Sequence, residues 1–122
     1  KIKDIIILGH AHCGGIAALC NSFNSSPSPD KKIQREFIDS WMDIASPVMD
    51  KIDYKECSEP LQHFVEKESI INSIQNLKTF PWVMELIKNK ELNIHGWWFE
   101  LKSGELFCLD ENKKNFIKVN ND

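Results

Sequence analysis

The chain has 122 residues, of which 42% are apolar, 27% are charged and four are cysteines, and its formal net charge is −3. This length fits one domain, and the slight acidity argues against a nucleic-acid binder, which normally presents a basic face. No apolar run approaches the ~20 residues of a membrane-spanning helix. The first residues do not resemble a secretory signal, and the irregular cysteine spacing predicts no disulfide framework, so we expect a cytoplasmic protein.

The N-terminal pattern predicts a strand over residues 4–9, a loop over residues 10–15 and a short helix from Ile16 to Cys20. The run from Ile5 to Leu8 is apolar on both faces, which is typical of an interior strand of a parallel sheet. An interior strand needs a neighbour on each side, yet the only other strand candidates lie near the C-terminus. We therefore expect that residues 1–122 are a single but incomplete domain, lacking a segment that precedes them.

The middle of the chain reads as mainly helical. Residues 21–30, rich in Ser, Asn and Pro, predict a surface excursion, and apolar residues at three- and four-residue steps predict a helix after Lys31. Pro47 is expected to open a further helical turn. A longer helix is expected over residues 61–77, with an apolar stripe, and Pro81 is well placed to begin another that runs to about Asn89.

The C-terminal part predicts two paired strands. Residues 92–101 and 106–109 are dense in apolar and aromatic side chains, and the turn between them contains Gly104. The tail after residue 109 is polar, with a few apolar anchors. The order of elements predicts an α/β fold: a mainly parallel sheet with helical cover and a C-terminal antiparallel hairpin, of which this chain supplies the later strands.

The loop that follows the first strand holds the best candidates for chemistry. His10, His12 and Cys13 lie within four positions, between glycines that permit a tight turn. Imidazole and thiolate are both good zinc ligands, although two ligands alone do not make a zinc site. Cys13 ahead of a helix could instead be a reactive thiol without metal. If both are helical, Cys20 lies about 10 Å away, too far to share a metal with it.

Other polar and aromatic residues are more typical of structural roles. We expect His63 to be solvated at the start of an amphipathic helix, and Glu66 and Glu68 to belong to a charged face. His95 is expected to make a structural hydrogen bond. The four tryptophans are more often core or interface anchors than cofactor contacts.

At this point several motifs resemble one family. Residues 5–16, which read Ile-Ile-Ile-Leu-Gly-His-Ala-His-Cys-Gly-Gly-Ile, resemble the zinc-binding segment of β-class carbonic anhydrases. The resemblance continues in order over nearly the whole chain, roughly residues 2–110. Its later parts are Trp41, the segment of residues 66–77, Thr79 to Val83, Ile94 to Trp97, and the strand–turn–strand that ends in Gly104 to Leu106.

The resemblance implies an enzyme that hydrates CO2 reversibly to bicarbonate and a proton, because zinc lowers the pKa of a water molecule that it binds. His10 and Cys13 match two of the three zinc ligands of the family, whereas His12 falls at a variable loop position. Gly14 and Gly15 would form the substrate side, where a side chain would crowd a small site. The base that carries the proton out is not identifiable from the sequence.

The resemblance also marks what this chain lacks. In the family, another zinc-ligating Cys begins a Cys-x-Asp-x-Arg motif on an earlier strand, and no such motif occurs in these residues. We therefore expect this chain by itself to bind zinc poorly. The family works as dimers or higher homo-oligomers, and the stripe of the 61–77 helix and the Trp97–Trp98 pair are interface candidates.

Two other hypotheses remain open beside the enzyme. The chain could be an inactive fragment, an interaction or structural remnant with an incomplete zinc site. Alternatively, it could be a metal-free thiol protein that uses Cys13 as its nucleophile.

Overall fold

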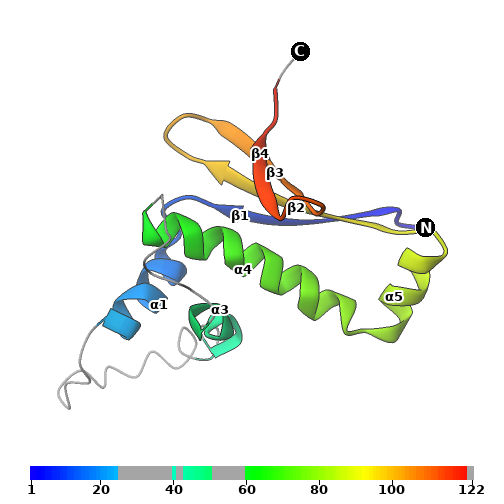
Figure 1. Cartoon of the computed structure of the whole chain (residues 1–122), viewed down its shortest axis with the longest axis horizontal. Helices are drawn as coiled ribbons and strands as arrows, with labels where there is room; N and C mark the ends of the chain where they lie inside the picture. Colours follow the sequence, from blue (N-terminus) through cyan, green and yellow to red (C-terminus); the bar gives the residue numbers. More distant parts are fainter. Residues whose placement is uncertain (25–39, 41–42, 51–59, 121–122) are drawn as a thin grey trace.

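The computed structural model describes residues 1–24, 40, 43–50 and 60–120 (Figure 1). Much of the helix expected after Lys31 lies outside these residues, as do Trp41 and Cys57. The elements are β1 (Asp4–His10), α1 (Gly14–Asn24), α3 (Pro47–Asp50), α4 (Leu61–Lys78), α5 (Pro81–Lys88), β2 (Asn93–Glu100), β3 (Glu105–Asp110) and β4 (Asn115–Lys118). Among the described residues, no helix is both long and apolar enough to cross a membrane.

The four strands form one mixed sheet in the order β1-β2-β3-β4. β1 and β2 are parallel and pair from Asp4 with Asn93 to His10 with Phe99. β2 with β3 and β3 with β4 are antiparallel, and the ladder between β2 and β3 is the expected hairpin. The α/β class, the helical cover and the C-terminal hairpin are thus confirmed.

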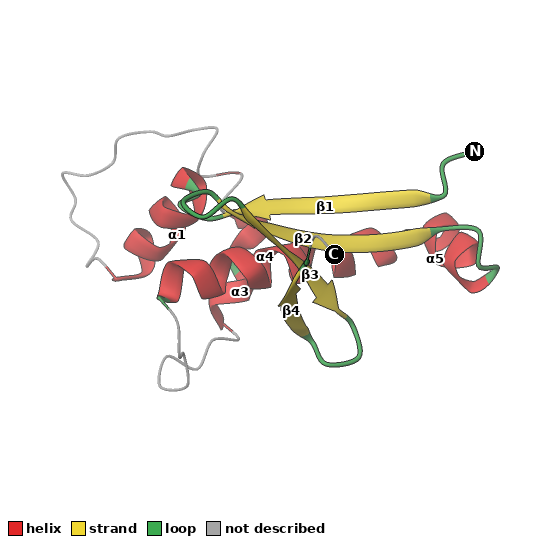
Figure 2. Ribbon diagram, turned by 90° about the horizontal axis from the view of Figure 1, so that it is seen from above, coloured by secondary structure: helices red, strands yellow, loops and turns green. Residues whose placement is uncertain are grey.

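Among the described residues, β1 has a paired neighbour on one side only, so its place as an interior strand of a larger sheet stays a prediction. It forms one end of the sheet, and its side chains alternate between partly buried and exposed. Ile6 and Leu8, on the outer face, are 46% and 62% exposed, while Ile7 packs against the core. In the part of the chain that the structure describes, only one face of β1 is covered, because α4 lies on that face alone (Figure 2).

β4 is a strand that the polar composition of the tail does not predict. Phe116 packs against the core cluster beneath the sheet, and the strand pairs with β3. The turn before it is shaped by Asp110, whose Oδ1 accepts hydrogen bonds from the backbone N–H groups of Asn112 and Lys113 at 3.0 and 3.3 Å. Such side-chain-to-backbone bonds stabilise tight turns whatever the hydrophobicity of the flanking residues.

α4 lies between the sheet on one side and α1 and α3 on the other (Figure 1). Its residue Val65 packs with α1 and α3, while Ile70 and Ile74 pack beneath the sheet with Trp98. Trp98 of the expected interface pair, and Ile70 and Ile74 beside the expected stripe of this helix, are instead core residues. Each is less than 5% exposed within this chain, because the helix has partners on two sides.

The contact between α4 and the sheet depends on two glycines. A Cβ at Gly96 would lie 3.0 Å from side-chain atoms of both Ile70 and Ile74, and 3.3 Å from Leu109 Cβ. A Cβ at Gly9 would lie 2.7 Å from the end of the Ile70 side chain. The missing side chains allow the helix to pack close to β1 and β2, immediately beside the loop that follows β1.

We predict that Gly96→Val lowers the free energy of unfolding by about 1–3 kcal/mol, because overpacking forces the neighbouring isoleucines out of place. Chemical denaturation followed by circular dichroism measures the change. Gly14→Ala is the matched control: a Cβ there meets no heavy atom within 4 Å, so stability should stay the same or rise. Unchanged stability in Gly96→Val would show that α4 does not approach the sheet this closely.

Candidate functional site

The loop between β1 and α1 is held at both of its ends by backbone hydrogen bonds. The Ala11 N–H donates to the Phe99 carbonyl of β2 at 2.8 Å, continuing the ladder beyond the end of β1. The Ala17 N–H donates to the Cys13 carbonyl at 2.9 Å, so Cys13 caps α1. Between them, His12 adopts φ 57°, a left-handed conformation that turns the chain. The predicted strand–loop–helix unit is thereby confirmed.

His10 lies exposed at the end of β1 with one ring nitrogen occupied. Its Nδ1 donates to the Ala11 carbonyl oxygen at 2.8 Å. A carbonyl oxygen can only accept, so Nδ1 carries the proton and a neutral ring leaves the Nε2 lone pair available. Second-shell bonds of this kind are what select the ligating nitrogen of metal-bound histidines. His10 is therefore suited to donate Nε2 to a metal.

Cys13 is half-buried, and its backbone is held by α4. Its N–H donates to Glu66 Oε2 at 3.1 Å, and its carbonyl accepts from Gln62 Nε2 at 3.3 Å. The thiol is free of disulfide bonding and packs beside the cluster of α1, α3 and α4. The backbone of the second ligand candidate is therefore fixed by hydrogen bonds, while its thiol is uncommitted.

These two donors do not make a complete metal site. Among the described residues, no group of three or more His, Cys, Asp and Glu side chains is arranged to hold a metal ion. Catalytic zinc sites use three protein ligands and one open position. His10 and Cys13 have suitable chemistry for two of those places, and the described residues provide no third donor beside them.

Gly14 and Gly15 occupy the first turn of α1. The first N–H groups of a helix have no intrahelical acceptor, so the two glycines present donors at the positive end of the helix. A Cβ at Gly14 would meet no atom within 4 Å among the described residues. Packing among the described residues thus does not require a glycine at position 14. That a side chain there would crowd a bound substrate stays a prediction.

Glu66 is the residue of the candidate site whose position the sequence analysis missed. It was expected on a charged face, yet its side chain is 1% exposed. Its Oε2 accepts from Cys13 N–H and Gln62 Nε2, both at 3.1 Å. Its Oε1 accepts from His63 Nδ1 at 2.9 Å and from Trp98 Nε1 at 3.3 Å. Cys13 N–H, Gln62 Nε2 and Trp98 Nε1 can only donate, and a proton on His63 Nδ1 makes that ring the fourth donor to the buried carboxyl group.

His63 is also less solvated than expected. Its side chain is only 19% exposed, because the ring meets His12 and Trp98 edge to face, with centroids 5.3 and 5.4 Å apart. Its Nε2 lies 4.0 Å from Glu100 Oε2. A row of aromatic rings thus connects the loop to β2, and His95 makes its predicted structural bond elsewhere, to Asp4 at 2.9 Å.

A four-residue spacing was the signal that could have revealed Glu66. Gln62, Glu66, Ile70 and Ile74 follow one another at steps of four along α4, and residues four apart share one face of a helix. Because Ile70 and Ile74 belong to the core, the two polar residues that continue their row were candidates for buried, hydrogen-bonded positions. Glu68 lies on a different side, where it lines a cleft of about 420 Å³ that includes neither His10 nor Cys13.

Comparison with known proteins assigns the chain to a family. A family model described as carbonic anhydrase matches residues 1–106. The beta carbonic anhydrase 6, mitochondrial, of Arabidopsis thaliana is 31% identical over 119 residues, which is 95% of this chain and 40% of that protein. Beta carbonic anhydrase 3 of the same plant is 32% identical over 115 residues, or 90% of this chain and 43% of that protein.

Solved structures agree with this assignment. The structure of the β-carbonic anhydrase CcaA matches with a TM-score of 0.75 and 25% identity, over 98% of this chain and 52% of that one. A tetrameric β-carbonic anhydrase from Sordaria macrospora shares the fold, with a TM-score of 0.66 and 22% identity over 89% of this chain and 53% of that one. The chain therefore spans about half of the length of these relatives, or less.

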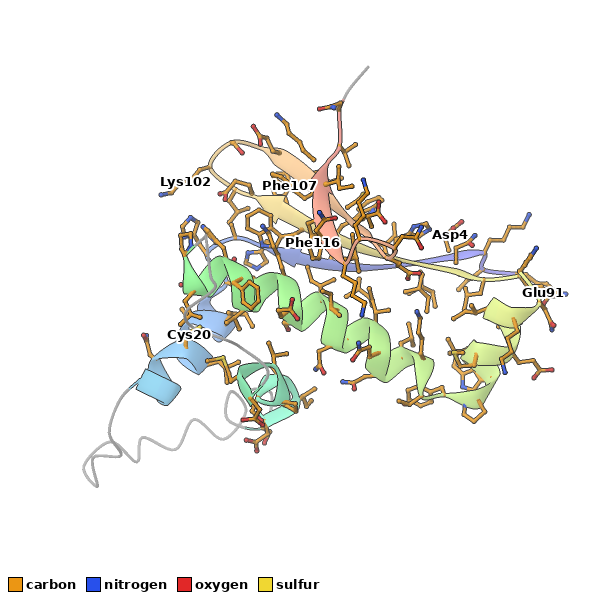
Figure 3. All side chains as sticks on the ribbon, in the orientation of Figure 1. Asp4, Cys20, Glu91, Lys102, Phe107 and Phe116 are labelled. Carbon is orange, nitrogen blue, oxygen red and sulfur yellow. The ribbon has the colours of Figure 1, made fainter. Side chains whose placement is uncertain are left out.

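The cysteines of α1 and the loop should differ in reactivity. Cys20 is 7% exposed beside the start of α4 (Figure 3), and burial, followed by the charge of Glu66, raises the pKa of its thiol. Because the thiolate is the reactive form, we predict that iodoacetamide labels Cys13 much faster than Cys20 in the metal-free native protein. Peptide mass spectrometry measures both rates, and denatured protein is the control. Equal rates in the native protein would contradict the observed burial.

Proposed function

Because this chain belongs to the β class of carbonic anhydrases, we propose that its protein hydrates carbon dioxide reversibly to bicarbonate and a proton, using zinc. The observation that carries the proposal is the loop after β1. It places a histidine with an available Nε2 and an uncommitted cysteine thiol beside the N-terminus of a helix. Nitrogen and sulfur donors at such a place are the chemistry that zinc prefers.

In this proposal His10 and Cys13 are zinc ligands. The bond from His10 Nδ1 to the Ala11 carbonyl orients the ring, and the bonds from α4 orient the backbone of Cys13. When bound, zinc supplies the Lewis acidity that makes water acidic enough to react near neutral pH. The remaining ligand has to come from residues outside the described ones, since those provide two.

Gly14 and Gly15 would contribute backbone rather than side chains. Their N–H groups lie at the start of α1, where the helix dipole favours negative charge. We propose that the Gly14 N–H donates a hydrogen bond to an oxygen of the substrate, which becomes more negative as bicarbonate forms. Preorganised N–H donors of this kind stabilise developing charge without reorganisation.

We further propose that the protein is a homo-oligomer of the cytoplasm. The relative from Sordaria macrospora is described as tetrameric. This chain exposes large apolar side chains on the outer face of β1 and on α5, where Trp82 is 58% exposed. Such residues, rather than the buried stripe of α4, are the candidates for contacts between subunits.

The test is metal analysis together with stopped-flow CO2 hydration on the complete gene product that contains residues 1–122. We predict stoichiometric zinc and rapid hydration in the wild type, and loss of both in His10→Ala and Cys13→Ser. Removing a ligand deletes a bond to the metal, whereas Cys108→Ser, on β3 and partly buried, should keep both. Size-exclusion chromatography with light scattering reports the oligomeric state.

Two results would overturn this proposal in different ways. Absence of zinc together with a nucleophilic Cys13 would favour a metal-free thiol protein. Absence of zinc, hydration and thiol reactivity would leave an inactive remnant with an incomplete site.

A further inference from the structure

We propose that Glu66 and Gln62 together form a clamp that positions Cys13 for metal binding. This inference rests on the proposed function, and it concerns residues that make no contact with the substrate in that proposal. Glu66 holds the backbone N–H of Cys13, and Gln62 holds its carbonyl, at 3.1 and 3.3 Å. The backbone N–H and the carbonyl of Cys13 are thus both hydrogen-bonded to side chains of one helix, α4.

The two side chains of the clamp are hydrogen-bonded to each other, and Glu66 is bonded to further neighbours. Gln62 and Glu66 lie one turn apart on α4, and Gln62 Nε2 donates to Glu66 Oε2 at 3.1 Å as well as to the Cys13 carbonyl. The other oxygen of Glu66 is held by His63 and Trp98, so the carboxylate cannot rotate without breaking bonds on both sides. A buried acceptor with four donors is rigid, and each broken bond leaves a buried polar group unsatisfied.

The two bonds from α4 add to the backbone bonds that hold the loop at Ala11 and at the start of α1. His12 has a left-handed φ of 57°, and glycines lie on both sides of the segment from His10 to Cys13. With the N–H and carbonyl of Cys13 both fixed, the direction of its Cα–Cβ bond is fixed too, and the thiol retains only its side-chain rotation. Metal sites need their ligands held in this way by the surrounding groups.

Because the hydrogen bonds involve different residues, single variants can distinguish a role in positioning Cys13 from a role in folding. Trp98 donates to Glu66, so Trp98→Phe removes one of the bonds that hold the carboxylate while both bonds from α4 to Cys13 stay in place. Gln62 is half-buried, so Gln62→Ala should fold while removing one of the two hydrogen bonds to the Cys13 carbonyl, the other being that from the Ala17 N–H. Glu66→Gln keeps the shape and one acceptor oxygen. With that oxygen toward the Cys13 N–H, the NH2 lies where Oε1 accepted, so His63 has to carry its proton on Nε2 and Trp98 Nε1–H loses its acceptor.

The experiment measures zinc affinity by chelator competition and exchange of the Cys13 amide proton by NMR, in the complete gene product. We predict that Glu66→Ala weakens zinc binding about 10- to 100-fold and loses protection of the Cys13 amide. Gln62→Ala should weaken zinc binding less, with the amide still protected. Glu66→Gln should restore most of the affinity and the protection. Trp98→Phe should keep wild-type zinc affinity even where it lowers thermal stability.

The outcomes separate this inference from the proposed function. Lack of zinc binding in the wild type overturns the proposed function, and the clamp as a device for metal binding with it. Wild-type zinc affinity and a protected Cys13 amide in folded Glu66→Ala overturn the clamp alone. If Glu66→Ala does not fold, equal zinc affinities of Gln62→Ala, Trp98→Phe and the wild type overturn it instead.

Discussion

A single buried carboxylate connects the parts of this structure. Glu66 is removed from water and accepts four hydrogen bonds, from its own helix, from β2 and from the loop after β1. A buried carboxylate is costly unless its oxygens are satisfied, so the helix, the strand and the loop all have to be in place together. The core and the candidate site therefore share one buried residue.

α4 makes this arrangement possible because it is covered on two sides. One side meets α1 and α3, the other packs beneath the sheet, and the polar positions 62 and 66 fall where these two cores meet the loop. The glycines at positions 9 and 96 let the helix approach β1 and β2 closely. Without that close approach, the side chains of α4 would not reach the backbone of Cys13.

The candidate site itself combines local and long-range contributions. His10 and Cys13 lie at the two ends of a short loop between a strand and a helix, which is where open α/β sheets place their functional residues. The His10 ring is oriented by its neighbour in sequence, Ala11, whereas Cys13 is oriented by residues about fifty positions away. The membership of the carbonic anhydrase family gives this geometry its chemical meaning.

The α/β class, the strand–loop–helix unit and the two donor residues were determined by the sequence alone. These features depend on local patterns: an apolar run, glycines around a His-x-x-Cys, and Pro81 at the start of a helix. Only the tertiary structure decided that Glu66, His63 and Trp98 are buried together, that β1 has one open face, and that a polar tail forms β4. A charged residue can be buried only where distant parts of the chain supply hydrogen-bond donors to it, and a local sequence pattern does not predict those donors.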